Sequence, residues 1–339
     1  MFIIAFVTQH IKGWDVNMLC LPINFITNSK PLKRTTLRIR ILMTWVILAS
    51  FFVGSIHSQQ SGTAVSIDGA QIYYKTFGKG QPLLIINGGP GMNSDGFEGL
   101  AVSLSEYFMT IIYDQRGTGK SALQVLDKTT ITMDLMLSDV ESIRKHLGFN
   151  TWSILGHSFG GMVASAYATV YPDHIDKIVL SSSGGINLKL LDYFRESLHS
   201  KLTATQLDSV NYWEGKIAAG ATDHYTRLQR GKYLAPAYVM DPQYYPVIAE
   251  RLTQGNGTIN QLMWDDLRKQ NFDCAPKLKA FDRPVLIIQG KQDIVRASTA
   301  EEAHKAYANS RILYMDHCIH YGWLDNPEVY FREVIKFLL

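Results

Sequence analysis

The feature that most constrains the fold is the sequence GHSFGG at residues 156–161, which separates two stretches of different periodicity. Residues 152–155 before it form a short apolar run typical of a buried strand, whereas residues 162–171 after it keep helical spacing. A G-x-S-x-G pattern between a strand and a helix predicts a sharp, strained turn, in which glycines avoid clashes at the flanking positions. The turn would project the hydroxyl of Ser158 above the sheet, beside the positive end of the following helix.

Apolar runs and helical segments alternate along most of the sequence after residue 64. Because short strands that alternate with helices build parallel sheets covered on both faces, the sequence predicts an α/β fold with a mainly parallel sheet. A hairpin precedes these runs, since Asp68-Gly69 is a strong turn signal. A capping box at Ser298 and Glu301, and Asn326 followed by a proline, predict the starts of two helices. The strand-like runs lie at residues 83–86, 110–113, 152–155, 177–180, 285–288 and 312–314.

Residues 186–280, called the cap segment from here on, interrupt this alternation. They contain no strand–glycine–helix unit and are rich in Leu, Tyr, Trp, Gln and charged residues at helical spacing. We therefore expect a mostly helical insertion between two parts of one core, residues 59–185 and 281–339. Ligands of parallel α/β sheets bind at the carboxyl ends of the strands, and an insertion at that edge would lie beside the binding site.

Residues 1–58 are predicted to be an N-terminal extension with a targeting signal rather than part of the fold. Basic residues between positions 33 and 40 precede an apolar run at 41–56, and polar residues follow from position 58. This order is typical of a secretory signal peptide, and the run is shorter than the ~20 residues of a membrane-spanning helix. We expect cleavage near Ser58 and a secreted or periplasmic protein with no membrane contact; an uncleaved N-terminal membrane anchor is the alternative.

The net charge of +3 comes from this first segment. The segment holds six Lys and Arg residues and one Asp, so that residues 59–339 carry 27 basic and 29 acidic residues. This balance gives no electrostatic reason to expect a nucleic-acid partner. The sequence GTGKS at 117–121 ends like a phosphate-binding P-loop, but that pattern needs a glycine at the position of Asp114, whose carboxylate would repel phosphates.

Two cysteines, Cys274 and Cys318, lie beyond the first segment. We favour two separate buried thiols; a disulfide, which an oxidising compartment would allow, is the alternative, and spacing alone does not decide between them. No cluster of Cys and His residues has the spacing of metal ligands, so we expect no zinc site.

A nucleophilic serine needs a base, and the base needs an orienting acid, in the chain order Ser, Asp, His for this architecture. Asp293 follows the strand-like run at 285–288 and is the candidate acid. Two histidines follow the last run: His317 nearly continues the strand, whereas His320 lies in the loop before the final helix. We favour His320 as the base, since a loop residue reaches over the turn more readily.

The oxyanion of such a reaction needs two aimed N–H groups. The residue after the nucleophile, Phe159, is one candidate donor. Gly89 is the other, because the glycine-rich loop at 87–91 follows the strand-like run at 83–86 and lets the backbone approach the substrate.

Three motifs resemble those of the proline iminopeptidase branch of the α/β hydrolases: GGPG at 88–91, DQRGTGKS at 114–121 and GHSFGG at 156–161. The resemblance runs from about residue 64 to the C-terminus and is weakest in the cap segment. It implies an α/β-hydrolase fold, with a mostly parallel eight-stranded sheet flanked by helices and an inserted helical cap. Asn87 stands where this family usually has histidine, and Ile319 stands where glycine commonly precedes the catalytic histidine.

The resemblance also implies roles for residues outside the triad. Asp114 and Arg116 would shape the floor of the active site, with Arg116 in a buried ion pair. Glu214, in the sequence YWEG at 212–215, is similar to the family's Trp-Glu segment and would hold the ammonium group of a peptide N-terminus. A solvated glutamate on a helix face is the alternative for Glu214.

Together these features predict a serine hydrolase that uses no cofactor and acts on a small molecule or a short peptide. The preferred reaction is release of an N-terminal residue, above all proline, from short peptides through an acyl-enzyme. An esterase or amidase acting on small apolar acyl substrates is the first alternative. A non-catalytic hydrolase-like binding protein is a more distant one, because a candidate nucleophile, acid and base are all present.

Overall fold

The computed structural model describes residues 59–339, and the predicted N-terminal extension and signal peptide lie outside the described residues. An eight-stranded sheet has the strand order β1-β2-β4-β3-β5-β6-β7-β8. The pairs β1–β2 and β2–β4 are antiparallel, and the other pairs are parallel, which confirms the predicted α/β fold class. The strands are β1 (Gln60–Val65), β2 (Gln71–Phe77), β3 (Pro82–Ile86), β4 (Met109–Tyr113), β5 (Trp152–His157), β6 (Ile175–Ser181), β7 (Val285–Gly290) and β8 (Ser310–Met315).

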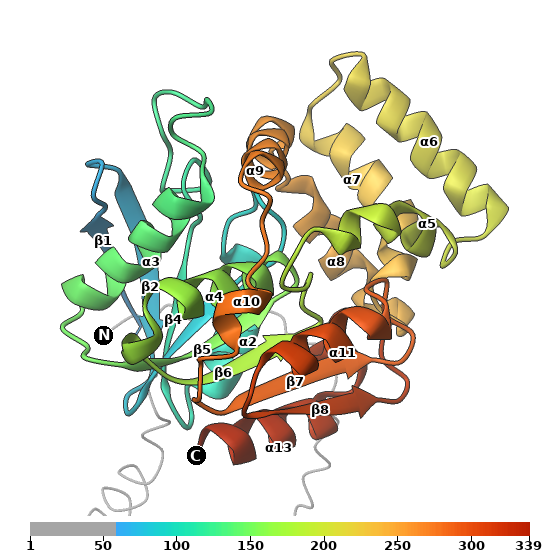
Figure 1. The fold of residues 1–339 in the computed structure, drawn as a ribbon. Helices are drawn as coiled ribbons and strands as arrows, with labels where there is room; N and C mark the ends of the chain where they lie inside the picture. The colour runs from blue at the N-terminus through green and yellow to red at the C-terminus, as the bar shows by residue number, and fades with distance from the viewer. Residues whose placement is uncertain (1–58) are drawn as a thin grey trace, which may run out of the picture. The chain divides into compact units, whose positions relative to one another are not determined.

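Helices cover the sheet on both faces (Figure 1). Among residues 59–339, we find no helix that is both long and apolar enough to cross a bilayer. The helices of the core are α2 (Glu98–Leu104), α3 (Met133–His146), α4 (Phe159–Val170), α11 (Ala297–Ala306), α12 (Gly322–Asp325) and α13 (Pro327–Leu338).

Alternate residues of the central strands face opposite layers of helices. In β3, Leu84 and Ile86 pack into the cluster that contains residues of α3 and α4, whereas Leu83 and Ile85 pack into the cluster with α2 and α13. All four side chains are at most 1% exposed. Burial on both faces explains why these strands are continuous apolar runs in the sequence rather than alternating ones.

The cap segment is helical, as expected, and it contributes no strand to the sheet. It follows β6 and precedes β7, and Figure 1 shows α6, α7 and α8 grouped on the side of the sheet away from α13. Its backbone reaches the loops that follow β3 and β8, because Asn256 N–H donates to the Gly91 carbonyl and His320 N–H donates to the Tyr238 carbonyl. The helices are α5 (Phe194–His199), α6 (Ala204–Ala218), α7 (His224–Leu234), α8 (Tyr245–Thr253), α9 (Gly257–Lys269) and α10 (Ala275–Leu278).

One of the two predicted helix starts is confirmed and the other is wrong. Helix α13 begins at Pro327, and the Asn326 side chain accepts a hydrogen bond from the N–H of Val329. Helix α11 begins at Ala297, so the predicted cap Ser298 lies inside the first turn. The Arg296 N–H that precedes this helix donates to the hydroxyl of Tyr193, a residue about 100 positions away, so tertiary contacts fix the start.

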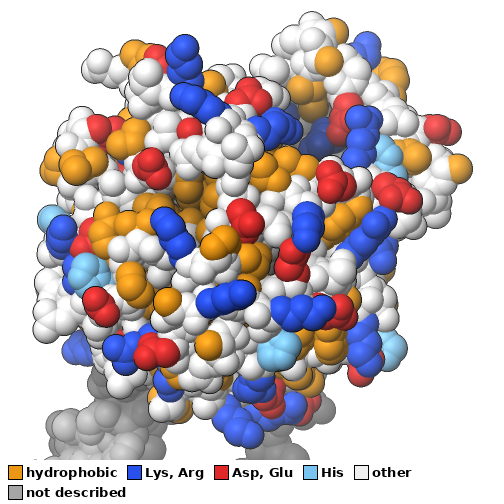
Figure 2. Space-filling view, viewed as in Figure 1, with side chains coloured by type: hydrophobic (Ala, Val, Ile, Leu, Met, Phe, Trp, Pro, Cys, Tyr) orange, Lys and Arg blue, Asp and Glu red, His pale blue; other side chains and the backbone are white. Residues whose placement is uncertain are grey.

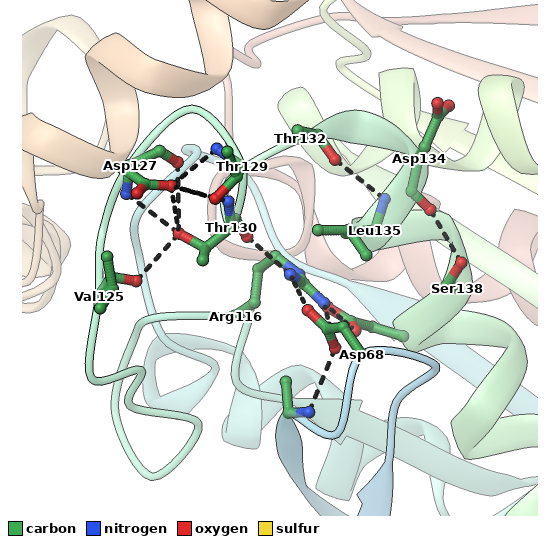
Figure 3. Close-up of polar contacts among 12 residues, drawn as sticks. Asp68, Arg116, Val125, Asp127, Thr129, Thr130, Thr132, Asp134, Leu135 and Ser138 are labelled. Atoms are coloured by element: carbon green, nitrogen blue, oxygen red, sulfur yellow. Dashed lines mark hydrogen bonds and ion pairs between the residues drawn. The ribbon is translucent and has the colours of Figure 1, made fainter.

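The loop after β4 is held by the buried ion pair expected for Arg116. Its guanidinium is fully buried and donates to both carboxylate oxygens of Asp139 in α3 at 2.8 and 2.7 Å. It also donates to Asp68 in the β1–β2 turn at 3.1 Å and to the Thr130 carbonyl, as Figure 3 shows. Lys120 lies over the ring of Tyr73 instead of at a helix start, so this loop has no P-loop geometry.

Charged side chains of both signs are interspersed over the face drawn in Figure 2. Nucleic-acid binding surfaces share a large continuous area of Lys and Arg side chains. Among the described residues on the face drawn in Figure 2, Lys and Arg form no such area.

Glu141 in α3 lies at the centre of a buried polar network. Its carboxylate accepts hydrogen bonds from Arg144 at 2.6 Å and from the Tyr167 hydroxyl at 2.7 Å, and the His174 ring lies 3.2 Å away. Burial by itself would raise the pKa of this carboxyl, but the bonds from Arg144 and Tyr167 outweigh it and lower the pKa of Glu141 to about 2. The ionised form is therefore the one that stabilises the fold.

We expect Glu141→Gln to lower the free energy of unfolding most at neutral pH. Since the folded pKa lies below that of the unfolded chain, the stabilisation is present above about pH 4.5 and is lost as the pH falls toward 2. Urea unfolding at a series of pH values should show the difference between the two proteins shrinking over this range. Glu328→Gln, at an exposed position in α13, is the control; a difference for Glu141→Gln that stays constant with pH would contradict the prediction.

Candidate active site

Ser158 occupies a strained turn between β5 and α4. Its backbone has φ 53° and ψ −120°, in the left-handed half of conformational space that residues other than glycine rarely adopt. A Cβ added at Gly160 would lie 2.1 Å from the Ile86 carbonyl oxygen, and one added at Gly156 would lie 2.4 Å from that of Gly160. The two glycines of the motif are therefore required by backbone packing, and the predicted strand–turn–helix arrangement is present.

His320 and Asp293 form a buried pair. The His320 Nδ1 atom lies 2.8 Å from Asp293 Oδ1, and the two residues are 2% and 7% exposed. The Asp293 carboxylate also accepts hydrogen bonds from the Val295 N–H and from Gln289 Nε2. Because Nδ1 faces the carboxylate, Nε2 is the ring nitrogen left for another partner.

The other candidate base, His317, lies elsewhere. Strand β8 ends at Met315, and the chain turns at His317, which has φ 49° and an exposed side chain. His317 does not line the cavity described next, whereas His320 does. The structure thus brings Asp293 together with His320 and leaves His317 outside.

A cavity of about 650 Å³ lies between the core and the cap segment. Ser158 and His320 both line it, together with the two candidate oxyanion residues Gly89 and Phe159. Asp293 is not part of the lining and lies behind His320. The cap segment contributes mainly apolar side chains to the wall, among them Leu190, Phe194, Ile217, Leu252 and Trp264.

The loop after β3 passes very close to the turn at Ser158. A Cβ added at Gly88 would lie 2.8 Å from the Ser158 Cβ, so only glycine fits at that position. Gly89 has φ +74°, and its N–H donates to no other group among the described residues. The N–H of Phe159, in the first turn of α4, likewise has no partner within the helix. Both predicted donors therefore border the cavity with N–H groups available.

The loop after β4 holds the loop after β3 in place through hydrogen bonds. Asp114 Oδ1 accepts hydrogen bonds from the Ser94 N–H at 2.9 Å and from the Ser94 hydroxyl at 2.8 Å. Gln115 Nε2 donates to the Asn87 carbonyl at 3.0 Å. Asp114 and Arg116 themselves do not line the cavity: Asp114 holds the loop after β3 through Ser94, whereas Arg116 holds the loop after β4 against α3 and the β1–β2 turn.

Glu214 lines the cavity, but it is already paired with a cation. Arg230 donates to Glu214 Oε1 through Nη2 at 2.9 Å and through Nε at 3.0 Å. Arg227 lines the same wall and donates to backbone carbonyls, including that of Thr253. Two guanidinium groups and one carboxylate leave this wall with a net positive charge.

Sequence reasoning missed two residues that contact the candidate base His320, namely Tyr238 and His157. The Tyr238 carbonyl accepts the N–H of His320, and its ring lies edge-on to the His320 ring at 5.7 Å. His157 is 1% exposed, its ring centroid lies 4.7 Å from that of His320, and within the described part of the chain neither of its ring nitrogens has a hydrogen-bond partner. Burial, followed by the charges of His320 and Arg251, lowers the pKa of His157 well below its usual value, so it stays neutral.

The two cysteines are separate buried thiols, not a disulfide. Burial raises the pKa of Cys274 to about 12 and raises that of Cys318 as well, so neither is a reactive thiolate at neutral pH. Within residues 59–339, no group of His, Cys, Asp and Glu side chains is arranged to hold a metal ion.

Two substitutions at Ser158 should separate backbone strain from chemistry. Glycine adopts positive φ without a Cβ penalty, whereas alanine keeps the penalty. We therefore expect Ser158→Gly to unfold at higher urea concentration than Ser158→Ala, by about 1 kcal/mol in free energy. Both variants lack the hydroxyl, so a difference reports the turn alone. Ser103→Gly and Ser103→Ala, in helix α2, are the control pair, for which alanine should be the more stable. Equal stability of the two Ser158 variants would show that the turn is unstrained.

Residues 81–327 match the model of the family described as alpha/beta hydrolase fold. The chain is similar to the proline iminopeptidase of Heyndrickxia coagulans, with 26% identity over 285 residues that cover 81% of this chain and 97% of the relative. It is also similar to that of Saccharolobus solfataricus, with 27% identity over 299 residues that cover 80% and 90%.

Solved structures of several hydrolases share the fold. A proline iminopeptidase from Mycobacterium smegmatis superposes with a TM-score of 0.61 at 22% identity, covering 82% of this chain and 97% of that chain. An esterase from Exiguobacterium antarcticum superposes with a TM-score of 0.61 at 21% identity, covering 82% and 99%. This proline iminopeptidase and this esterase are thus equally similar to the chain in backbone.

Proposed function

The chain belongs to the α/β-hydrolase family, and we propose that it is a serine hydrolase in which Ser158, His320 and Asp293 act as a triad. The observation that carries the proposal is the 2.8 Å contact between His320 Nδ1 and Asp293 Oδ1, made by a histidine that shares a cavity with Ser158. A buried carboxylate on Nδ1 fixes the tautomer in which Nε2 can accept a proton.

In the proposed reaction, the Ser158 hydroxyl oxygen attacks the acyl carbon of the substrate, and His320 Nε2 takes the hydroxyl proton. The N–H groups of Gly89 and Phe159 donate to the oxyanion of the tetrahedral intermediate. The intermediate collapses to an acyl-enzyme as His320 returns the proton to the leaving group. Water, activated by the same histidine, then releases the acyl group and restores Ser158. This sequence consumes one water and needs no cofactor.

The preferred substrate is a short peptide from which an N-terminal residue, above all proline, is released. The support comes from relatives with the name proline iminopeptidase that match over 90% or more of their length. A carboxylate, Glu214, also lies on the wall of the cavity. In this proposal the substrate's ammonium group takes the place of Arg230 on Glu214.

A second candidate is an esterase or amidase that acts on small apolar acyl groups. The observation in its favour is the ion pair between Glu214 and Arg230, which neutralises the one carboxylate that residues 59–339 contribute to the cavity wall. The net positive charge of the cavity wall would repel a free ammonium group, whereas a neutral acyl group would contact mainly apolar side chains.

Loss of any triad member should abolish turnover without loss of the fold. We expect Ser158→Ala, His320→Gln and Asp293→Asn each to lower kcat/KM by about 10⁴-fold or more. Assays of the purified protein would compare prolyl- and alanyl-arylamides with a short-chain nitrophenyl ester. His317→Gln is the matched control and should keep full activity, since this histidine is exposed and outside the cavity. Unchanged turnover in Ser158→Ala would sink the proposal.

Glu214→Gln should distinguish the two substrate candidates. If Glu214 holds an ammonium group, the variant loses about 10- to 100-fold in kcat/KM for the prolyl-arylamide, as expected for one hydrogen bond to a charged group. Turnover of the nitrophenyl ester would stay within about twofold. Glu196→Gln, an exposed cap glutamate that pairs with Arg296 outside the cavity, is the control. An equal effect on both substrates would exclude the ammonium role and favour the esterase.

A further inference from the structure

A further arginine of the cap segment, Arg251 in α8, reaches the loop after β3. It is 3% exposed, and its guanidinium donates through Nη2 to the Gly88 carbonyl at 3.1 Å and through Nη1 to the Asn93 carbonyl at 2.6 Å. The guanidinium carbon also lies 5.1 Å from the centre of the Phe97 ring. Arg251 therefore joins the cap segment to both ends of the loop that carries Gly89.

Among the described residues, Arg251 forms no ion pair, although it is buried. Its hydrogen-bond acceptors include two backbone carbonyls and the side-chain oxygen of Gln254, and the hydroxyl of Tyr321 is a further polar neighbour of the guanidinium. Burial lowers the pKa of Arg251, yet an arginine side chain stays protonated in proteins. A buried cation without a carboxylate is costly, so its position beside the catalytic loop requires an explanation beyond packing.

The Gly88 carbonyl and the Gly89 N–H are the two ends of one planar peptide group. That carbonyl accepts a second hydrogen bond, from Asn87 Nδ2 at 3.1 Å. Two donors on one carbonyl hold the whole peptide group in a single orientation. A charged donor also polarises the peptide, which makes the N–H at its other end a stronger donor.

We propose that Arg251 is a positioning residue that orients and polarises the Gly88–Gly89 peptide for the oxyanion. The inference rests on the proposed function, because it assumes that the Gly89 N–H donates to the tetrahedral intermediate. It assigns to the cap segment a part in the chemical step in addition to substrate selection. Arg251 is not one of the residues that line the cavity, so it acts through the peptide and not on the substrate.

The test compares Arg251→Lys and Arg251→Met with the unaltered full chain, on the substrate that the protein turns over best. Lysine keeps the charge but cannot bridge the Gly88 and Asn93 carbonyls in the same planar geometry. We expect kcat to fall about 10-fold in Arg251→Lys and about 10²- to 10³-fold in Arg251→Met, with KM changed less than about threefold. Arg144→Lys, at a buried arginine of α3 that also donates to backbone carbonyls, is the control and should keep kcat.

A second measurement separates positioning from general loss of structure. An alkyl boronic acid forms a tetrahedral adduct with a serine nucleophile and places an oxygen where the oxyanion forms. Its affinity should fall in the Arg251 variants by the same factor as kcat, because both depend on the oriented N–H. Asn87→Ala removes the other donor to the Gly88 carbonyl and should lower both quantities in the same direction, and it replaces Arg251→Met if that variant does not fold.

Three results would overturn the inference: unchanged kcat in Arg251→Lys and Arg251→Met, a rise in KM with kcat retained, or a loss of kcat without a parallel loss of boronic acid affinity. Ser158→Ala separates this failure from failure of the proposed function. If Ser158→Ala is inactive and Arg251→Met keeps kcat, the triad stands and only the role of Arg251 is lost. If Ser158→Ala stays active, the proposed function is wrong whatever the Arg251 variants do.

Discussion

The approach of Gly160 to the carbonyl oxygen of Ile86 is the contact on which the site depends. It allows the first turn of α4 to lie directly against the end of β3, and a single Cβ at Gly160 would come within 2.1 Å of that oxygen. The same approach forces the backbone of Ser158 into a conformation that costs a residue with a side chain about 1–3 kcal/mol. Strand pairing compensates, since β5 lies between β3 and β6 and the Ser158 N–H donates to the Ser181 carbonyl. The hydroxyl and the oxyanion loop meet because two strands are neighbours in the sheet.

The cap segment contacts this arrangement at several separate places. From α8, Arg251 reaches the Gly88 carbonyl, and from the segment before α8 the Tyr238 carbonyl holds the N–H of His320. From α6 and α7, Glu214 and Arg230 contribute an ion pair to the cavity wall. The first two contacts bear on the orientation of catalytic groups, and the third bears on what the cavity accepts. In the proposed function, one insertion thus serves both chemistry and selection through separate contacts.

Much of the site could be predicted from the sequence because its residues follow strands. Ser158, Asp293 and the loop with Gly89 each come within a few positions of an apolar run, and carboxyl ends of parallel strands meet at one edge of a sheet. Arg251 carries no such local signal, since its partner Gly88 lies 163 positions away. The wrong helix start at Ser298 has the same origin, because a contact from Tyr193 fixes the chain before α11. The sequence reports local geometry well and contacts between distant segments poorly.

The division between core and cap also explains why proteins that share this fold can act on different substrates. The backbone contacts that build the turn at Ser158 involve glycines and strand pairing, which any substrate class can share. A proline iminopeptidase and an esterase therefore superpose equally well on this chain. The charge of the wall formed by α6 and α7 is set by a few side chains that no backbone superposition tests. In the proposed function, a net positive wall disfavours a cation and tolerates a neutral group, so we expect the balance between Glu214 and its two neighbouring arginines to influence which substrates enter.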